Sequence, residues 1–144
     1  MKPNRIRPIA ICVFRDAGRL FLVEWRRPST GEPFYRPLGG AIEFGEHSRD
    51  CIVREIREEV GAEITDLTYL GTIESIFAYE GEPGHEIVLV YEARFADPRL
   101  YEVESVIGQD DGGELVAVWK SIAYFQAGEA PLYPDGLLDL LDGI

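Results

Sequence analysis

Short apolar runs separated by turn residues dominate the start of the chain. The runs Ile6–Phe14 and Arg19–Trp25 are rich in β-branched and aromatic residues, which favours strands. The sequence Asp16-Ala17-Gly18 between them predicts a turn, so we expect the two strands to pair as a hairpin. Pro8 lies near the start of the first strand and favours a strand that begins at a sheet edge.

The hydrophobic period changes from that of a strand to that of a helix beyond residue 40. A short strand over Phe34–Leu38 is expected to lead into two glycines, whose backbone can approach a ligand closely. The next apolar residues fall within about 100° of one another on a helical wheel. These residues are Ile52, Val53, Ile56 and Val60. The pattern predicts a helix with Ser48 as its N-cap and Gly61 at its end.

The rest of the chain predicts strands, two short helices and one long loop. Strands are expected over residues 64–79, 86–95 and 115–119, and a turn over residues 81–84 makes the first two a hairpin. Short helices are expected over residues 121–126 and 134–141. Asp97–Gly113 is interpreted as an irregular acidic loop. This order predicts an α/β protein in which a mixed sheet carries helices on both faces.

Composition narrows the classes of protein that fit. A length of 144 residues is that of a single domain over residues 1–144. The net charge of −12 argues against binding to nucleic acid. Two cysteines, Cys12 and Cys51, do not make a disulfide framework, so we expect a cytoplasmic protein. No stretch predicts a membrane span or a signal peptide, so no membrane association is expected.

Three glutamates lie close together on the predicted helix. Glu58 and Glu59 follow Glu55 at the spacings that bring side chains to one helical face. Like charges at these spacings destabilise a helix, so a bound cation is expected to offset them. Carboxylates alone are oxygen ligands, which suit Mg²⁺, Mn²⁺ or Ca²⁺.

These glutamates belong to a longer motif that runs from Gly40 to Ala62. The motif resembles the signature of the Nudix (MutT-like) hydrolases, G-x5-E-x7-R-E-U-x-E-E-x-G-U, in which U is a bulky aliphatic residue. The matched positions are Gly40, Glu46, Arg54, Glu55, Ile56, Glu58, Glu59 and Gly61. Ala62 is the one departure, and it concerns packing rather than chemistry.

The resemblance implies an α/β/α sandwich and a metal-dependent hydrolase. Such an enzyme would cleave a pyrophosphate bond in a nucleoside diphosphate linked to another moiety, with Mg²⁺ or Mn²⁺ as cofactor. It implies Glu55, Glu59, Glu58 and the Gly40 carbonyl as metal ligands. It also implies that Arg54 orients the glutamates and that Glu46 joins the network around it. The sequence does not distinguish between Glu55 and Glu58 as the general base.

Other candidates lie outside the motif. Arginine suits bidentate recognition of phosphate, and the cations nearest the glycine loop are Arg26, Arg27 and Arg36. Some family members take another acidic ligand from the loop before the last strand, where Glu114, Asp110 and Asp111 compete with one another. Aromatic residues near the predicted strands either stack on a base or pack in the core. They are Phe34, Tyr35, Phe77 and Tyr79.

Two other hypotheses about function compete with the hydrolase. One is a nucleotide-metabolite sensor of the same fold with little turnover, although such modules usually lack signature glutamates that are all present here. The other is an acidic metal-binding protein without a nucleotide site. The substrate is open among oxidised nucleoside triphosphates, nucleotide sugars, ADP-ribose and dinucleoside polyphosphates. A homodimer is possible, since dimers are common in the family.

Overall fold

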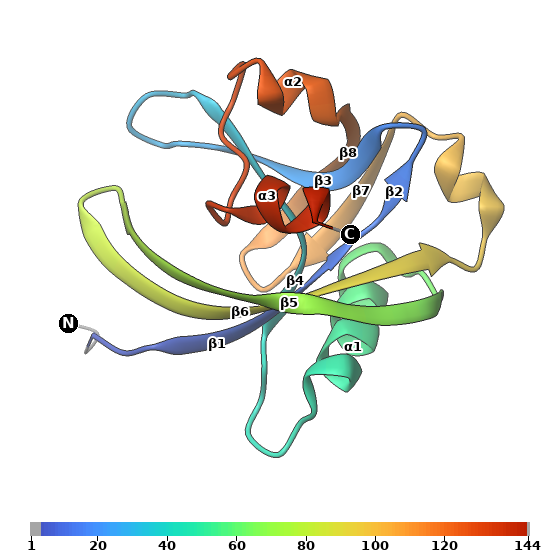
Figure 1. Cartoon of the computed structure of the whole chain (residues 1–144), viewed down its shortest axis with the longest axis horizontal. Helices are drawn as coiled ribbons and strands as arrows, with labels where there is room; N and C mark the ends of the chain where they lie inside the picture. Colours follow the sequence, from blue (N-terminus) through green and yellow to red (C-terminus); the bar gives the residue numbers. More distant parts are fainter. Residues whose placement is uncertain (1–3, 144) are drawn as a thin grey trace.

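A computed structural model describes residues 4–143, which form one mixed eight-stranded sheet with helices on both faces (Figure 1). The spatial order is β5-β6-β1-β4-β3-β8-β7, and β2 pairs only with β3. The strands are β1 (Arg7–Val13), β2 (Arg15–Asp16), β3 (Arg19–Arg26), β4 (Pro33–Ala41), β5 (Ile64–Tyr79), β6 (Glu82–Phe95), β7 (Ser105–Asp110) and β8 (Gly113–Ser121). The helices are α1 (Ser48–Val60), the 3₁₀ helix η1 (Pro98–Tyr101), α2 (Ile122–Gln126) and α3 (Leu137–Asp142).

Each face of the sheet carries its own hydrophobic core. On one face, Cys51, Ile52 and Ile56 of α1 pack into a cluster with apolar residues of the sheet. On the other face, the buried residues Phe125 of α2 and Leu137 and Leu141 of α3 pack against the sheet. Figure 1 shows α1 on the opposite side of the sheet from α2 and α3. This arrangement confirms the predicted α/β/α sandwich with a mixed sheet.

The pairing of β1 differs from the prediction. The strand lies between β4, which is antiparallel to it, and β6, which is parallel to it, so it is an interior strand. The predicted hairpin between Ile6–Phe14 and Arg19–Trp25 is wrong, because β4 lies between β1 and β3 in the sheet. The turn before β3 instead pairs β3 with the two residues of β2. Pro8 is tolerated because it lies in the first residues of the strand.

Strand β4 connects two parts of the sheet that diverge from each other. Its end from Leu38 to Ala41 pairs with β1, whereas its start from Pro33 to Pro37 pairs with β3. The part that contains β5, β6 and β1 therefore meets the part that contains β3, β8 and β7 along this one strand. The two parts form the walls of the cleft described below.

The predicted acidic loop over Asp97–Gly113 is also wrong, since it contains η1 and the edge strand β7. Gly108 in β7 explains the close approach of this strand to α1. A Cβ on this glycine would lie 1.9 Å from the carbonyl oxygen of Glu59, so only glycine fits. Strand β7 thereby brings the turn that follows it to the end of α1.

The ends of α1 are set differently from each other. Gly61 ends the helix in the left-handed conformation at φ 68°, and its N–H donates to the carbonyl of Arg57, as predicted for a glycine at this position. His47, rather than Ser48, is the N-cap residue, and its side chain makes no capping hydrogen bond. The Ser48 hydroxyl instead lies 2.5 Å from the hydroxyl of Tyr91.

None of the helices within residues 4–143 is both long and apolar enough to cross a membrane.

Candidate active site

The paired glycines place backbone directly against neighbouring strands and carboxylates. Gly39 has φ +146°, and a Cβ there would lie 2.1 Å from the carbonyl oxygen of Ala10 in β1. A Cβ on Gly40 would lie 2.6 Å from the Glu55 carboxylate. The absence of side chains at these positions therefore lets the end of β4 lie on the acidic face of α1.

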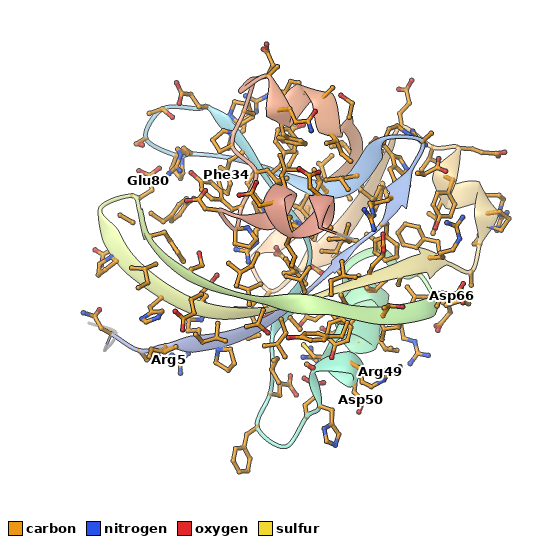
Figure 2. All side chains as sticks on the ribbon, in the orientation of Figure 1. Arg5, Phe34, Arg49, Asp50, Asp66 and Glu80 are labelled. Atoms are coloured by element: carbon orange, nitrogen blue, oxygen red, sulfur yellow. The ribbon has the colours of Figure 1, made fainter. Side chains whose placement is uncertain are left out.

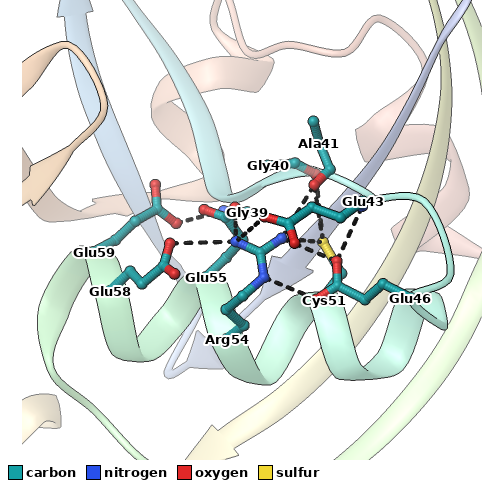
Figure 3. A network of polar contacts seen from close by, with 10 residues as sticks. All are labelled: Gly39, Gly40, Ala41, Glu43, Glu46, Cys51, Arg54, Glu55, Glu58 and Glu59. Carbon is teal, nitrogen blue, oxygen red and sulfur yellow. Dashed lines mark hydrogen bonds and ion pairs between the residues drawn. The ribbon is translucent and has the colours of Figure 1, made fainter.

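Arg54 holds the carboxylates of the signature together (Figure 3). Its Nε donates to Glu46 at 2.8 Å and its Nη2 donates to the other oxygen of the same carboxylate at 3.0 Å. Its Nη1 donates to Glu55 at 2.8 Å and to Glu58 at 3.3 Å. Nη2 also donates to the Ala41 carbonyl at 3.2 Å. One guanidinium thus joins the loop after β4 to three carboxylates.

The contacts of Arg54 stabilise the ionised forms of the groups around it. Its hydrogen bonds, followed by one involving the Glu43 backbone, lower the pKa of Glu46 to about 2. The same hydrogen bonds, donated by Arg54 to Glu46, raise the pKa of Arg54. Glu46 is therefore a permanent anion at neutral pH that fixes the guanidinium.

Glu59 has the opposite electrostatic environment. It is 7% exposed, and one of its oxygens accepts a hydrogen bond of 2.9 Å from the Gly39 N–H. Burial, with the nearby charges of Glu55 and Asp110, raises its pKa to about 8, although Gly39 and Arg36 oppose this shift. Burial is also the largest cause of the raised pKa of Glu55. Without a bound cation, the acidic face therefore disfavours the ionised forms of Glu55 and Glu59.

The acidic face forms one end of a cleft of about 1100 Å³ between the two parts of the sheet. The turn between β7 and β8 brings Asp110 and Asp111 to this end, where they affect the pKa values of Glu59 and Glu55. Glu114, the third candidate from this segment, is exposed on β8 and does not line the cleft. The structure thus brings two of the three candidate acids to the glutamates.

Two of the three candidate arginines line the same cleft. Arg36 faces it from β4 and Arg27 faces it from the loop that follows β3. Arg26 is exposed outside the cleft lining, where its guanidinium donates to the Gly31 carbonyl at 3.0 Å. The alternation of side chains along β3 accounts for this difference between adjacent residues.

Aromatic side chains form the far end of the cleft around Arg27. The centre of the Arg27 guanidinium lies 5.4 to 5.9 Å from the rings of Phe34, Tyr79 and Tyr133, and Nη2 donates to the Tyr133 hydroxyl at 2.8 Å. Figure 2 shows Phe34 opposite Glu80, which lies at the tip of the β5–β6 hairpin. Phe77 also lines the cleft, whereas Tyr35 is buried in the core beside α2.

Cys51 packs beneath the site. Its thiol donates to the carbonyl oxygens of Ala41 at 3.5 Å and Gly40 at 3.7 Å. Burial, with Glu46 nearby, raises its pKa to about 12, so it is a neutral thiol at physiological pH. These contacts favour a packing role over a role as a metal ligand, since a soft thiol does not suit a site of hard oxygen ligands.

Sequence reasoning missed Glu86 and Tyr133, which both line the cleft. Glu86 stood inside a predicted strand, and only its charge in an otherwise apolar run marked it. Tyr133 precedes a proline in a segment without a periodic pattern, so no local signal identified it.

The donor set fits a hard divalent cation. Glu55, Glu58 and Glu59 offer only oxygen atoms, and a Cβ on Gly40 would lie 2.6 Å from the Glu55 carboxylate, so the Gly40 backbone is beside this donor set. Within residues 4–143, no three acidic, histidine or cysteine side chains converge on one point. Glu55 and Glu58 instead accept hydrogen bonds from Arg54, and Glu59 accepts one from the Gly39 N–H. A cation would favour the ionised forms of Glu55 and Glu59, whose pKa values are raised without it.

The sandwich fold is similar to that of solved Nudix structures. A MutT NUDIX hydrolase from Burkholderia pseudomallei aligns over 83% of this chain and 86% of its own, with 23% identity and a TM-score of 0.61. A NUDIX hydrolase from Nitrosomonas europaea aligns over 96% of this chain and 87% of its own, with 20% identity and a TM-score of 0.65. At these identities the likeness concerns the fold.

The family itself follows from the sequence match. The model of the NUDIX domain matches residues 4–138, so the chain belongs to the NUDIX family, and the resemblance drawn from the signature is confirmed.

Curated relatives match over part of the chain. A protein named NAD-capped RNA hydrolase NudC, from Pseudomonas aeruginosa, is 30% identical over 103 residues, which cover 72% of this chain and 34% of that protein. The protein of the same name from Mycobacterium tuberculosis is 41% identical over 69 residues, which cover 47% of this chain and 21% of that protein. The aligned part thus spans about a fifth to a third of the length of these relatives.

Proposed function

We propose that the chain is a Nudix pyrophosphohydrolase that cleaves a nucleoside diphosphate linked to another moiety. The carrying observation is the Arg54 network, in which one guanidinium contacts Glu46, Glu55 and Glu58 beside a buried Glu59. Every charged position of the family signature is thereby present, with three glutamates in contact with Arg54, and with Glu59 on the same helix as Arg54. A sensor that had lost catalysis would not need this cluster to be complete.

In this proposal the acidic face holds a divalent cation, with Mg²⁺ favoured by the oxygen-only ligands. Glu55 and Glu59 would hold the ion together with the Gly40 carbonyl, and Glu58 would contribute directly or through water. When bound, the ion supplies charge for the phosphoryl oxygens and an acidified water. The NUDIX family generally uses divalent ions, but the choice between Mg²⁺ and Mn²⁺ is part of the proposal.

The protein's own residues have distinct roles in this scheme. Arg54 orients Glu55 and Glu58, either of which can accept the proton of the attacking water. Glu46 keeps the guanidinium of Arg54 in the plane that this orientation requires. Arg36 on the opposite wall contributes positive charge to a phosphate of the substrate, which offsets part of the repulsion from the surrounding acids.

The size and composition of the cleft favour a nucleotide conjugate as the substrate. A volume of about 1100 Å³ is at the upper end of small-molecule sites, so it accommodates a nucleotide together with a second group. The aromatic residues around Arg27 offer stacking surfaces at the end away from the carboxylates. The curated relatives act on an NAD cap, which is a dinucleotide with a pyrophosphate bond. Because the net charge is −12, we favour a free conjugate over a capped RNA.

The test is turnover across a panel with and without Mg²⁺. The panel contains NADH, ADP-ribose, nucleotide sugars, dinucleoside polyphosphates and nucleoside triphosphates, and the products measured are the nucleotide and the second phosphorylated moiety, which is pyrophosphate for a triphosphate. Metal-dependent release of a nucleoside monophosphate that is lost in Glu59→Gln would support the proposal. Binding of a panel compound by calorimetry without any turnover would instead identify a sensor.

A further inference from the structure

Glu86 is a buried charge in the cleft that the signature does not explain. Glu59 and Glu86 are the two charged residues buried within the described part of the chain, and Glu86 is 5% exposed. It lies on β6, not on the acidic helix, and it lines the cleft into which the substrate phosphates would bind. A buried carboxylate is costly unless it is paired, and at a site for a polyanion it would also repel the ligand.

Two guanidiniums face the two oxygens of this carboxylate. Arg7 Nη1 lies 3.4 Å from Oε2, and Arg36 Nη2 lies 3.8 Å from Oε1. Arg7 is opposite Glu86 in the parallel ladder between β1 and β6, so its position follows from the strand register. The three groups together carry a net charge of +1. Glu86 therefore does not make this wall of the cleft negative.

The contact with Arg36 joins the two walls of the cleft. Arg36 lies on the part of β4 that pairs with β3, whereas Glu86 lies on β6 in the other part of the sheet. Arg36 is also close enough to Glu59 to oppose the rise in its pKa. Without Glu86, the strongest attraction on the Arg36 side chain would come from the acidic face of α1. Glu86 supplies an attraction in the opposite direction.

We propose that Glu86 is a positioning residue that holds Arg36, with Arg7 beside it, as a phosphate-binding pair facing the acidic helix. The inference rests on the proposed function, because it assigns this pair to the phosphates of a nucleotide conjugate. Arg36 is about one-third exposed, so its remaining N–H groups are accessible to a ligand oxygen. Arginine held in this way loses less conformational entropy on binding than a free side chain does.

The test compares Glu86→Gln with a matched variant on the same strand. Glu92→Gln is the control, because Glu92 is also paired with an arginine, Arg15, but does not line the cleft. Binding of α,β-methylene-ADP, which resists hydrolysis, is measured by calorimetry in the presence of Mg²⁺. We expect Glu86→Gln to raise Kd by about tenfold or more while Glu92→Gln stays within about twofold of the parent protein. For any panel compound that is turned over, KM should rise likewise with little change in kcat.

A double variant tests whether Glu86 acts on ligand binding through Arg36. Because Glu86 acts through Arg36 in this scheme, Arg36→Ala should raise Kd by a similar factor, and adding Glu86→Gln to it should change Kd little further. Additive losses, or an unchanged Kd in Glu86→Gln, would overturn the proposal. The binding assay needs no turnover. If the parent protein hydrolysed no panel compound but Glu86→Gln still weakened binding, the proposed function would be rejected and the positioning role of Glu86 would stand.

Discussion

Arg54 donates two hydrogen bonds to the single carboxylate of Glu46, at 2.8 Å from Nε and 3.0 Å from Nη2. This bidentate contact fixes the plane of the guanidinium, and the same plane directs Nη1 to Glu55 at 2.8 Å. Glu46 lies in the loop before α1, so the contact also fixes that loop against the helix. The orientation of Glu55 therefore depends on a residue that lies outside the helix.

Replacement of Arg54 by lysine is expected to reduce turnover despite the retained charge. A lysine ammonium is a compact charge that cannot hold two oxygens of Glu46 and still reach Glu55 in a fixed plane. Loss of a residue that orients ligands typically reduces activity by about 10- to 100-fold. The measurement is kcat on the best panel substrate at saturating Mg²⁺. Arg57→Lys is the control, since Arg57 is exposed and pairs only with Glu63 in the contacts described. Equal activity of Arg54→Lys and the parent protein would refute this role.

Replacement of Glu55 or Glu59 by glutamine is expected to abolish most turnover and leave the fold intact. Glutamine keeps the shape of each side chain but removes the negative charge that would hold the cation. We expect kcat to fall by about 100-fold or more, because these residues would contact the ion directly. Glu63→Gln, at an exposed position after the end of the helix, serves as the control. Circular dichroism should be unchanged in all three variants. Near-full activity in either site variant would remove it from the set of metal ligands.

Without metal, Glu59 should make stability depend on pH. Its pKa is about 8 in the folded protein against an ordinary value of 4.5, so the folded state binds the proton more tightly than the unfolded state. This contribution is fully present below pH 4.5 and is lost as pH rises through 8. The free energy of unfolding should therefore fall over this window, by at most about 1.4 kcal/mol per pH unit.

The measurement for this pH dependence is urea unfolding in chelator at several pH values, for the parent protein and for Glu59→Gln. Since every other group titrates in both proteins, the difference between their free energies of unfolding isolates Glu59. That difference should change across the window and be constant below it. A constant difference at all pH values would show that folding does not change the pKa of Glu59.

The helix of the site was predictable because its determinants are local. The stripe that includes Ile52 and Ile56 and the left-handed Gly61 lie within one short stretch, so periodicity and cap chemistry suffice to define it. The position of β1 was not predictable in this way. Its partner β6 is distant in sequence, and the register of a parallel pair is set by packing over the whole sheet.

Strand β7 was missed for a physical reason that concerns the site. Gly108 weakens the strand signal, yet it is the residue that lets β7 lie against the Glu59 carbonyl. The pairing of Arg36 with Glu86 was likewise beyond local reasoning, because the two residues face each other only when the two parts of the sheet meet. Sequence thus identified the acidic end of the cleft and the arginines Arg27 and Arg36, but not the buried Glu86 that faces Arg36.

Replacement of Gly40 by alanine tests the placement of Glu55 without changing any charge. The new Cβ would lie 2.6 Å from both the carboxyl carbon and Oε1 of Glu55 and 2.8 Å from Oε2, which is closer than real Cβ contacts allow. The Glu55 carboxylate is the end of a flexible side chain, so it should rotate away at little cost to the free energy of unfolding. We therefore expect the thermal midpoint to shift by only about a few degrees while kcat falls by about tenfold or more.

Gly143→Ala is the control for this substitution. Gly143 ends α3 at φ −79°, and a Cβ there would make only ordinary contacts, at 3.6 Å or more, so both activity and stability should be unchanged. If Gly40→Ala retained full activity, the Glu55 carboxylate would not be needed where it now lies. If it lost stability and activity together, the backbone rather than the side chain would have moved, because alanine would then have forced β4 away from α1. Only loss of activity with stability retained assigns the effect to the position of Glu55.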